Sequence, residues 1–174
     1  VQINTSAAGF SPLETAWLFT PWPLAIMLVG PLAGRLADRI NPSLLSSTGL
    51  VLLIIGLVAL AQVDEGTGVA GSLWRTALCG IGFGLFQPPN NREMMGSLPP
   101  ERSANVSGVM STMRTVGQSF GVALVGAALA LGAPVQLTLW LGAATTLLAL
   151  LASLSRIRVA QQALLARRAS SAGK

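Results

Sequence analysis

Five long apolar stretches constrain the fold of this 174-residue chain more than any other feature of its sequence. A helix needs about 20 residues to cross a bilayer core of about 30 Å, and each stretch comes close to that length. Glycine and proline are frequent in them, as in transmembrane helices, and the alternating segments of about ten residues that build membrane barrels are absent. The stretches predict an all-α, polytopic transmembrane helix bundle with spans over residues 16–33, 43–62, 71–87, 106–131 and 135–154.

The composition agrees with a lipid environment. Hydrophobic residues make up 52% of the chain and charged residues 10%, whereas a soluble domain has about 25% charged residues. The net charge is +5, and the basic residues lie beside the apolar stretches. We therefore expect a bilayer and no nucleic acid as the partner. With one cysteine, Cys79, and no histidine, we expect no disulfide, no metal site and no cofactor. No nucleophile–base pair is evident either, which argues against an enzyme.

The distribution of lysine and arginine predicts the orientation in the membrane. Under the positive-inside rule, the connectors that hold the basic residues lie in the cytoplasm. We therefore expect a multi-pass protein of the cell (inner) membrane with a cytoplasmic C-terminus, whose basic tail, residues 155–174, forms a short amphipathic helix. Arg75 falls near the outer end of its span, where we expect it to snorkel. The basic residues on the cytoplasmic side are Arg35, Arg39, Arg92, Arg102, Arg156, Arg158, Arg167, Arg168 and Lys174.

The five spans differ in the faces that they present. The second and fifth are almost uniformly apolar, which favours lipid-facing helices, whereas the first, third and fourth carry small and polar positions, which favour protein or a cavity. The third has a stripe with Gly80 and Gly84, which lets another backbone approach closely, either as a packing seam alone or as part of a cavity wall. The run 80–84 also contains three glycines, but without a preceding strand and a following acidic residue it does not indicate a nucleotide site.

The third span is expected to end at residues 87–91, Gln-Pro-Pro-Asn-Asn. Pro88 and Pro89 lack the backbone donors that a helix needs, so carbonyl groups there are freed. The segment is either a plain helix terminus or a hinge that brings Gln87 and Asn91 to the mouth of a cavity.

The fourth span places an arginine inside the membrane. A charge at such depth costs about 2.5–3.5 kcal/mol, so such residues usually face a pathway or a partner. Arg114 shares a face with Ser107, Ser111 and Gln118, and a structural salt bridge or carbonyl contact remains the alternative to a transport role. The candidate cavity residues are Arg114, Gln87, Asn91 and Gln118, and a second packing seam is expected at Gly117 and Gly121.

Residues 30–39, Gly-Pro-Leu-Ala-Gly-Arg-Leu-Ala-Asp-Arg, resemble the loop signature of the major facilitator superfamily. In that family the signature joins the second and third helices, and a degenerate copy joins the eighth and ninth. Gly34 stands where the first copy is acidic, which fits the second copy. The resemblance implies a loop that switches between two packings, formed by Gly30, Leu32, Gly34, Arg35, Asp38 and Arg39.

Three further blocks, residues 9–14, 82–102 and 114–123, resemble the fourteen-helix branch of drug:proton antiporters. The resemblance covers about residues 9–154 and implies the last five core helices, eight to twelve in the twelve-helix count. Because the chain opens without methionine or a signal-peptide pattern, we expect a C-terminal part of a transporter whose N-terminal half is its missing partner.

The resemblance implies export of amphipathic, often cationic drugs in exchange for protons by alternating access. Proton coupling needs a carboxylate within the cavity, and no Asp or Glu falls at mid-membrane depth in this sequence. The coupling carboxylates are therefore expected in the missing half. Transport of a siderophore, sugar or other metabolite and a non-transporting membrane scaffold remain the alternative functions.

Overall fold

The computed structural model describes residues 16, 17, 19–63, 68–96 and 103–172. The sequence block 9–14, the residues Glu101 and Arg102 and the C-terminal Lys174 lie outside the described residues. The described part contains helices and no strand, so the prediction of an all-α bundle is confirmed. Its helices are α2 (Pro21–Leu36), α3 (Pro42–Ala61), α4 (Gly68–Gly96), α5 (Ser103–Ala130) and α6 (Val135–Ala172).

Two of the described helices are long and apolar enough to cross a membrane, judged by length and composition alone. They are Pro42–Ala61, with a mean hydropathy of 2.5, and Val135–Ser155, with a mean hydropathy of 1.9. The limits of the five spans within the bilayer stay a prediction from the sequence.

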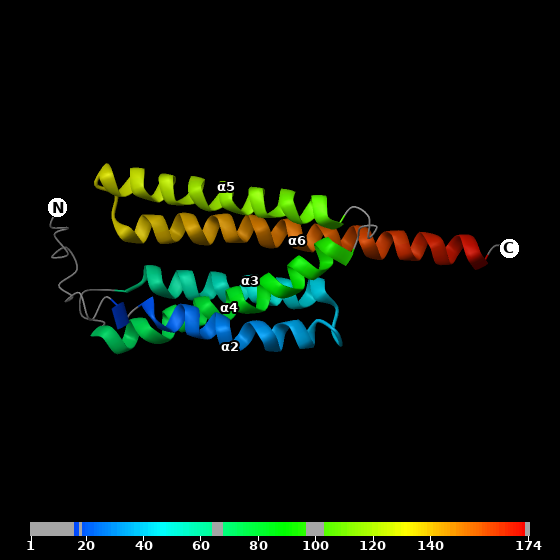
Figure 1. Cartoon of the computed structure of the whole chain (residues 1–174), viewed down its shortest axis with the longest axis horizontal. Helices are drawn as coiled ribbons and strands as arrows, with labels where there is room; N and C mark the ends of the chain where they lie inside the picture. Colours follow the sequence, from blue (N-terminus) through cyan, green and yellow to red (C-terminus); the bar gives the residue numbers. More distant parts are fainter. Residues whose placement is uncertain (1–15, 18, 64–67, 97–102, 173–174) are drawn as a thin grey trace.

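Helices α2, α3, α4 and α6 pack against one another, and α5 lies beside them with few contacts to α4 and α6 (Figure 1). The main helix pairs in contact are α3 with α4, α2 with α4, and α3 with α6. Asn41 caps α3, because its side-chain oxygen accepts a hydrogen bond from the Ser43 backbone N–H at 3.0 Å. Pro42 follows at the first helical position, where a missing donor costs nothing.

Helix α4 continues through Pro88 and Pro89 to Gly96. The prediction that this helix ends at residues 87–91 is therefore wrong. A buried membrane helix tolerates proline where neighbouring groups compensate for the lost backbone bonds. Pro89 is fully buried against the bundle, and one turn later the Glu93 carboxylate accepts a hydrogen bond from the Ser43 hydroxyl. Packing and side-chain bonds thus hold the last two turns helical.

Helix α6 runs unbroken to Ala172. Residues 155–172 continue the last span as one helix, whereas the sequence pattern predicts a separate short helix for the tail. The connection follows from the sequence of this region, which has no proline or glycine between Ser155 and Ala172 to stop a helix.

Helix α3 lies between α6 and the pair α2 and α4 (Figure 1). It is buried along two faces and exposes one stripe of Leu44, Thr48, Val51 and Ile55, so its predicted contact with lipid is confined to that stripe and stays a prediction. Small residues allow the burial, since they let neighbouring helices approach. The buried residues of α3 are Ser43, Leu45, Ser46, Ser47, Gly49, Leu50, Leu53, Gly56 and Ala61.

Glycines bring the backbones of α3 and α4 together. A methyl group on Gly82 would lie 2.5 Å from the Leu53 backbone nitrogen, and one on Gly49 would lie 2.6 Å from the Phe86 nitrogen. On the other side of α4, a methyl group on Gly80 would lie 2.6 Å from the Trp22 carbonyl oxygen. Because backbone atoms cannot move aside, these positions accept only hydrogen.

Hydroxyl groups join α3 to α6. The Ser47 and Ser153 hydroxyls are 3.0 Å apart and both residues are buried. Ser47 also donates to the Ser43 carbonyl oxygen at 2.8 Å, so the Ser153 hydroxyl supplies the proton for the bond between the helices.

Candidate functional site

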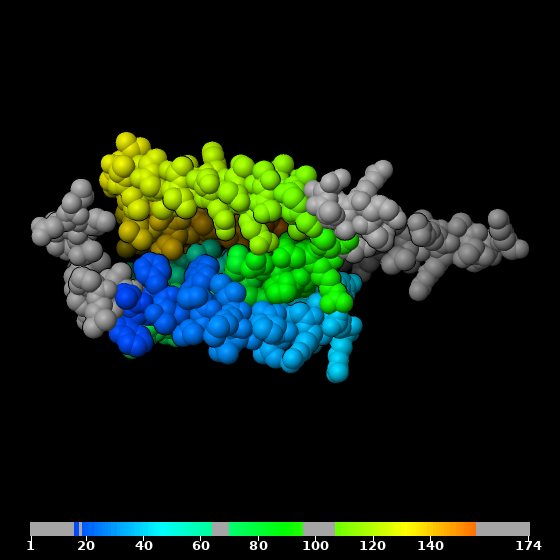
Figure 2. Space-filling view, in the orientation of Figure 1, coloured from blue at the N-terminus to red at the C-terminus, as the bar shows by residue number. Residues whose placement is uncertain are grey.

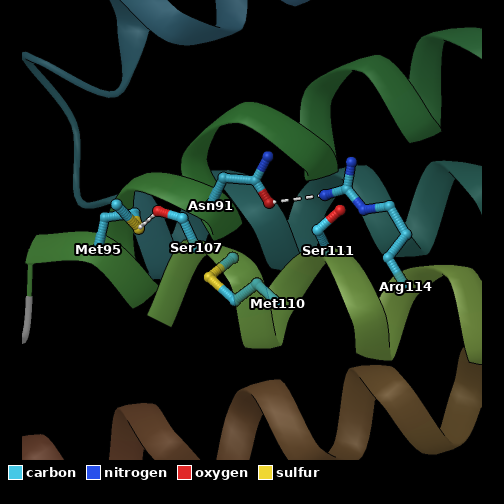
Figure 3. A pocket seen from close by; sticks show the side chains of 6 residues that line it. All are labelled: Asn91, Met95, Ser107, Met110, Ser111 and Arg114. Carbon is cyan, nitrogen blue, oxygen red and sulfur yellow. Dashed lines mark hydrogen bonds between the residues drawn. The ribbon is translucent and has the colours of Figure 1, made fainter. Parts of the chain in front are cut away.

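A cavity of about 320 Å³ opens between the end of α4 and the start of α5. Figure 3 shows its lining side chains, two from α4 and four from α5. The α5 residues recur at three- and four-residue steps, so they share one helix face. The lining residues are Asn91, Met95, Ser107, Met110, Ser111 and Arg114.

Arg114 and Asn91 point toward each other across the cavity (Figure 3). The Arg114 Nη2 donates a hydrogen bond to the Asn91 Oδ1 at 3.0 Å. At the other end of the cavity, the Ser107 hydroxyl donates to the Met95 sulfur at 3.6 Å. The amide of Asn91 is neutral, and none of the six lining residues is acidic. The cavity therefore carries the positive charge of Arg114.

The continuation of α4 past its prolines positions Asn91. The residues that follow Asn91 bind the rest of the bundle, because Arg92 forms an ion pair with Asp38 and Glu93 accepts the Ser43 hydrogen bond. Asn91 is thereby held opposite α5 while its two neighbours attach the same helical turn to Asp38, which follows α2, and to Ser43 of α3. A helix that stopped at Gln87 would leave Arg114 without this acceptor.

The structure brings together two of the four predicted cavity residues. Arg114 and Asn91 line the cavity, whereas Gln87 is half-buried on α4 and Gln118 is exposed on α5, and neither lines it. Met95 and Met110 were not predicted from the sequence. Each lies four residues from a predicted residue, so extending the stripes of Asn91 and Arg114 by one helical turn would have found them.

The loop signature contacts α4 but lies outside the cavity. Gly30 and Gly34 are within α2, and a methyl group on either would have no atom within 4 Å among the described residues. Leu32, Arg35 and Arg39 are exposed. Asp38, which follows α2, pairs with Arg92 while both side chains stay about half exposed. The signature is thus attached to the same turn of α4 that presents Asn91.

The two predicted glycine seams differ. Gly80 and Gly84 both pack on α2, where a methyl group on Gly84 would lie 3.2 Å from the Val29 Cβ. Gly117 and Gly121 face open space, because a methyl group on either would meet no atom within 4 Å in the described part of the chain. Between residues 107 and 130, helix α5 is mostly exposed, and it lies along one edge of the molecule (Figure 2).

Arg75 lies over an aromatic ring. Its guanidinium carbon is 5.3 Å from the centre of the Trp74 ring, a cation–π contact. Its Nε and Nη1 atoms are buried and have no hydrogen-bond partner among the described residues.

Comparison with known proteins decides the family. The family model of the Major Facilitator Superfamily matches residues 2–172. The chain belongs to the major facilitator superfamily. This agrees with the helical transmembrane bundle and with the loop signature at residues 30–39.

Three relatives illustrate the range within this superfamily. The chain is 46% identical over 117 residues to the uncharacterized transporter YebQ of Escherichia coli, which covers 67% of the chain and 26% of YebQ. It is 33% identical over 129 residues to the multidrug resistance protein Stp of Mycobacterium tuberculosis, covering 74% of the chain and 24% of Stp. It is 24% identical over 115 residues to the riboflavin transporter RibZ of Clostridioides difficile, covering 66% of the chain and 25% of RibZ.

The chain spans about a quarter of the length of these relatives. This coverage fits the prediction that the sequence corresponds to part of a longer transporter. No solved structure matches the chain.

Proposed function

We propose that this chain supplies part of the C-terminal half of a secondary active transporter that exports amphipathic drugs in exchange for protons. Alternating access would rock this half against an N-terminal half around a shared cavity. The observation that carries the proposal is Arg114, a charged side chain within a predicted span that faces a cavity and has a neutral hydrogen-bond partner. A transporter retains a costly group of this kind where it meets a solute.

The similarity to Stp supports a drug as the solute, because that protein is described as a multidrug resistance protein. The transporter would lie in the cell membrane with the C-terminal part of α6 in the cytoplasm. No catalytic step or cofactor is needed for this activity.

Proton coupling would depend on carboxylates outside this chain. Among the described acidic side chains near the cavity end of α4, Asp38 pairs with Arg92 and Glu93 accepts from Ser43 through one oxygen, and neither lines the cavity. We place the coupling carboxylates in the N-terminal half, which pairs with this chain to complete the pathway.

Transport of another metabolite is the second candidate. The similarity to RibZ favours it, because RibZ is described as a riboflavin transporter. A non-transporting scaffold is disfavoured by the cavity and by the energetic cost of placing Arg114 within a membrane span.

Expression of the full-length gene in a bacterium that lacks its own major efflux pumps tests the proposal. We expect lower susceptibility to several amphipathic drugs and lower accumulation of fluorescent substrates, both lost when an uncoupler dissipates the proton gradient. Unchanged susceptibility and accumulation for every compound, with the protein present in the membrane, would refute drug export.

Arg114→Ala in the full-length protein tests the site. Removing a charge-assisted hydrogen-bond donor costs about 1.5–3 kcal/mol, so we expect export to fall about tenfold or more at unchanged membrane expression. Thr112→Val is the matched control, because the Thr112 hydroxyl donates to the Gly108 carbonyl of its own helix at 3.0 Å and does not line the cavity. Unchanged efflux, or loss of expression alone, would assign Arg114 a structural role.

A further inference from the structure

We infer that the cavity between α4 and α5 binds a carboxylate of the transported compound, and that the preferred substrates join this group to an apolar body. The inference rests on the proposed transport function and specifies its substrate class. Its starting point is that Arg114 has more hydrogen-bond donors than its interaction with Asn91 uses. A guanidinium carries five N–H donors in a planar fork, and the interaction with Asn91 occupies one nitrogen, Nη2.

The neutral partner determines the charge that the cavity attracts. An aspartate or glutamate at position 91 would neutralise Arg114, whereas the Asn91 amide fixes the guanidinium in place and leaves its charge uncompensated. None of the six lining residues is acidic, and the ion pair among the described residues joins Arg92 to Asp38 instead. A carboxylate fits the remaining fork because it can accept two parallel hydrogen bonds from one guanidinium.

The other lining groups suit the rest of such a compound. Met95 and Met110 offer flexible, polarizable surfaces that adapt to apolar and aromatic bodies. Ser111 lies beside Arg114 in the cavity and adds a hydroxyl that can donate to a second oxygen (Figure 3). The volume of about 320 Å³ is at the lower end of the range for small-molecule sites, about 300–1,000 Å³, so it holds a small compound or one end of a larger one.

The same features disfavour a cation at this position. A cationic group here would meet the like charge of Arg114 without a carboxylate from the lining residues to offset it. At this position the lining residues therefore favour acidic or zwitterionic compounds over the cationic drugs that the sequence resemblance implies.

Transport of two matched dyes tests the inference. The probes are a rhodamine with a free carboxylate and the methyl ester of the same rhodamine, which keeps the aromatic body and loses the anionic oxygen. The full-length transporter is reconstituted in vesicles of phosphatidylcholine alone, so that neither cellular esterases nor anionic lipid headgroups interfere. Initial rates are measured under an imposed pH gradient.

We expect the wild-type protein to carry the acid about tenfold faster than the ester, the discrimination expected from one charge-assisted contact. Arg114→Gln should lower the rate for the acid about tenfold and change the rate for the ester by less than about twofold. Arg114→Lys, which keeps the charge but not the fork, should give an intermediate rate for the acid. Thr112→Val should leave both rates unchanged.

A wild-type preference for the ester, or an equal loss of both dyes in Arg114→Gln, would overturn the inference. If Arg114→Gln does not reconstitute, Asn91→Ala replaces it, because it keeps the charge and removes the group that positions it. Its expected result is a selective loss of acid transport, and equal rates to wild type would contradict the inference. A transporter that confers drug resistance in cells but carries neither dye refutes the inference and leaves the proposed export function standing, whereas one that does neither refutes both.

Discussion

At the scale of single residues, small side chains determine how the helices meet. The largest fully buried side chains of the described bundle are Pro89, Cys79, Ser46 and Ser153. Small side chains therefore fill the most deeply buried positions, where backbones approach closely. Four-residue spacing in the sequence was enough to identify Gly80 and Gly84. It did not identify Gly49 and Gly82, because neither has another glycine four residues away in the sequence.

Gly82→Ala is expected to destabilise the full-length protein. The added methyl group would lie 2.5 Å from the Leu53 backbone nitrogen and 2.8 Å from the Gly49 carbonyl oxygen, and such overpacking costs about 1–3 kcal/mol. The apparent unfolding temperature of the purified protein should therefore drop.

Gly142→Ala is the control for this prediction. Its methyl group would lie 3.8 Å from Leu57 Cδ1, an ordinary van der Waals distance at the contact between α6 and α3. We expect little change in unfolding temperature. Equal stability of the two variants would contradict the packing described for α3 and α4.

The cavity shows which site residues a sequence pattern can predict. Helical spacing and the cost of a charge inside the membrane selected Arg114, and the polar stripe of α4 selected Asn91. Gln87 and Gln118 belong to the same stripes but lie outside the cavity. A stripe predicts which residues share a face of one helix, and the point where two stripes meet depends on how the helices cross.

At the scale of helices, α4 affects the geometry of the site most. Two adjacent prolines normally stop a helix, and this local rule predicts an end at residues 87–91. Tertiary contacts reverse the outcome, because Pro89 is buried and the next turn is held by bonds to Ser43 and Asp38. Because these contacts join residues that are far apart in the sequence, the sequence pattern alone did not reveal them.

The ion pair between Asp38 and Arg92 is expected to act on transport and hardly on stability. Both side chains are about half exposed, and such pairs contribute about 0–1 kcal/mol. Asp38→Arg alone places like charges opposite each other and should slow export by disturbing the turn of α4 that carries Asn91. The initial export rate and the unfolding temperature measure the two effects separately.

The double variant Asp38→Arg with Arg92→Asp restores opposite charges and should recover much of the export rate. If each single variant and the exchange transport equally well, the pair has no role in the cycle. If the single variants fail to fold, the pair is structural.

At the scale of the whole molecule, the sequence was sufficient for the class and the family. Span length, low charge and the loop signature predicted a helical bundle of the major facilitator superfamily, and both are confirmed. The positions of the helices were predicted less well, since uniform apolarity suits a lipid-facing helix and a central one equally. Helix α3 is central because its small residues fit against α4 and α6.

Cysteine labelling tests the predicted orientation. In the Cys79→Ala background, Gln62→Cys should react with a membrane-impermeant maleimide in intact cells, because the connector after α3 carries no basic residue and is expected outside. Arg39→Cys, in the basic connector after α2, should react only after the membrane is permeabilised. Both side chains are exposed in the structure, so reactivity reports the side of the membrane. The opposite labelling pattern would show that the predicted topology is inverted.

Cys79 gives the protein an internal chemical reporter. It is the single cysteine of the chain, it is 0% exposed, and its sulfur lies where a methyl group on Gly56 would be 2.6 Å away. A thiol reagent can reach this sulfur only when α3 and α4 have separated. Its rate of alkylation therefore measures how often the native bundle opens at this interface, without any added label.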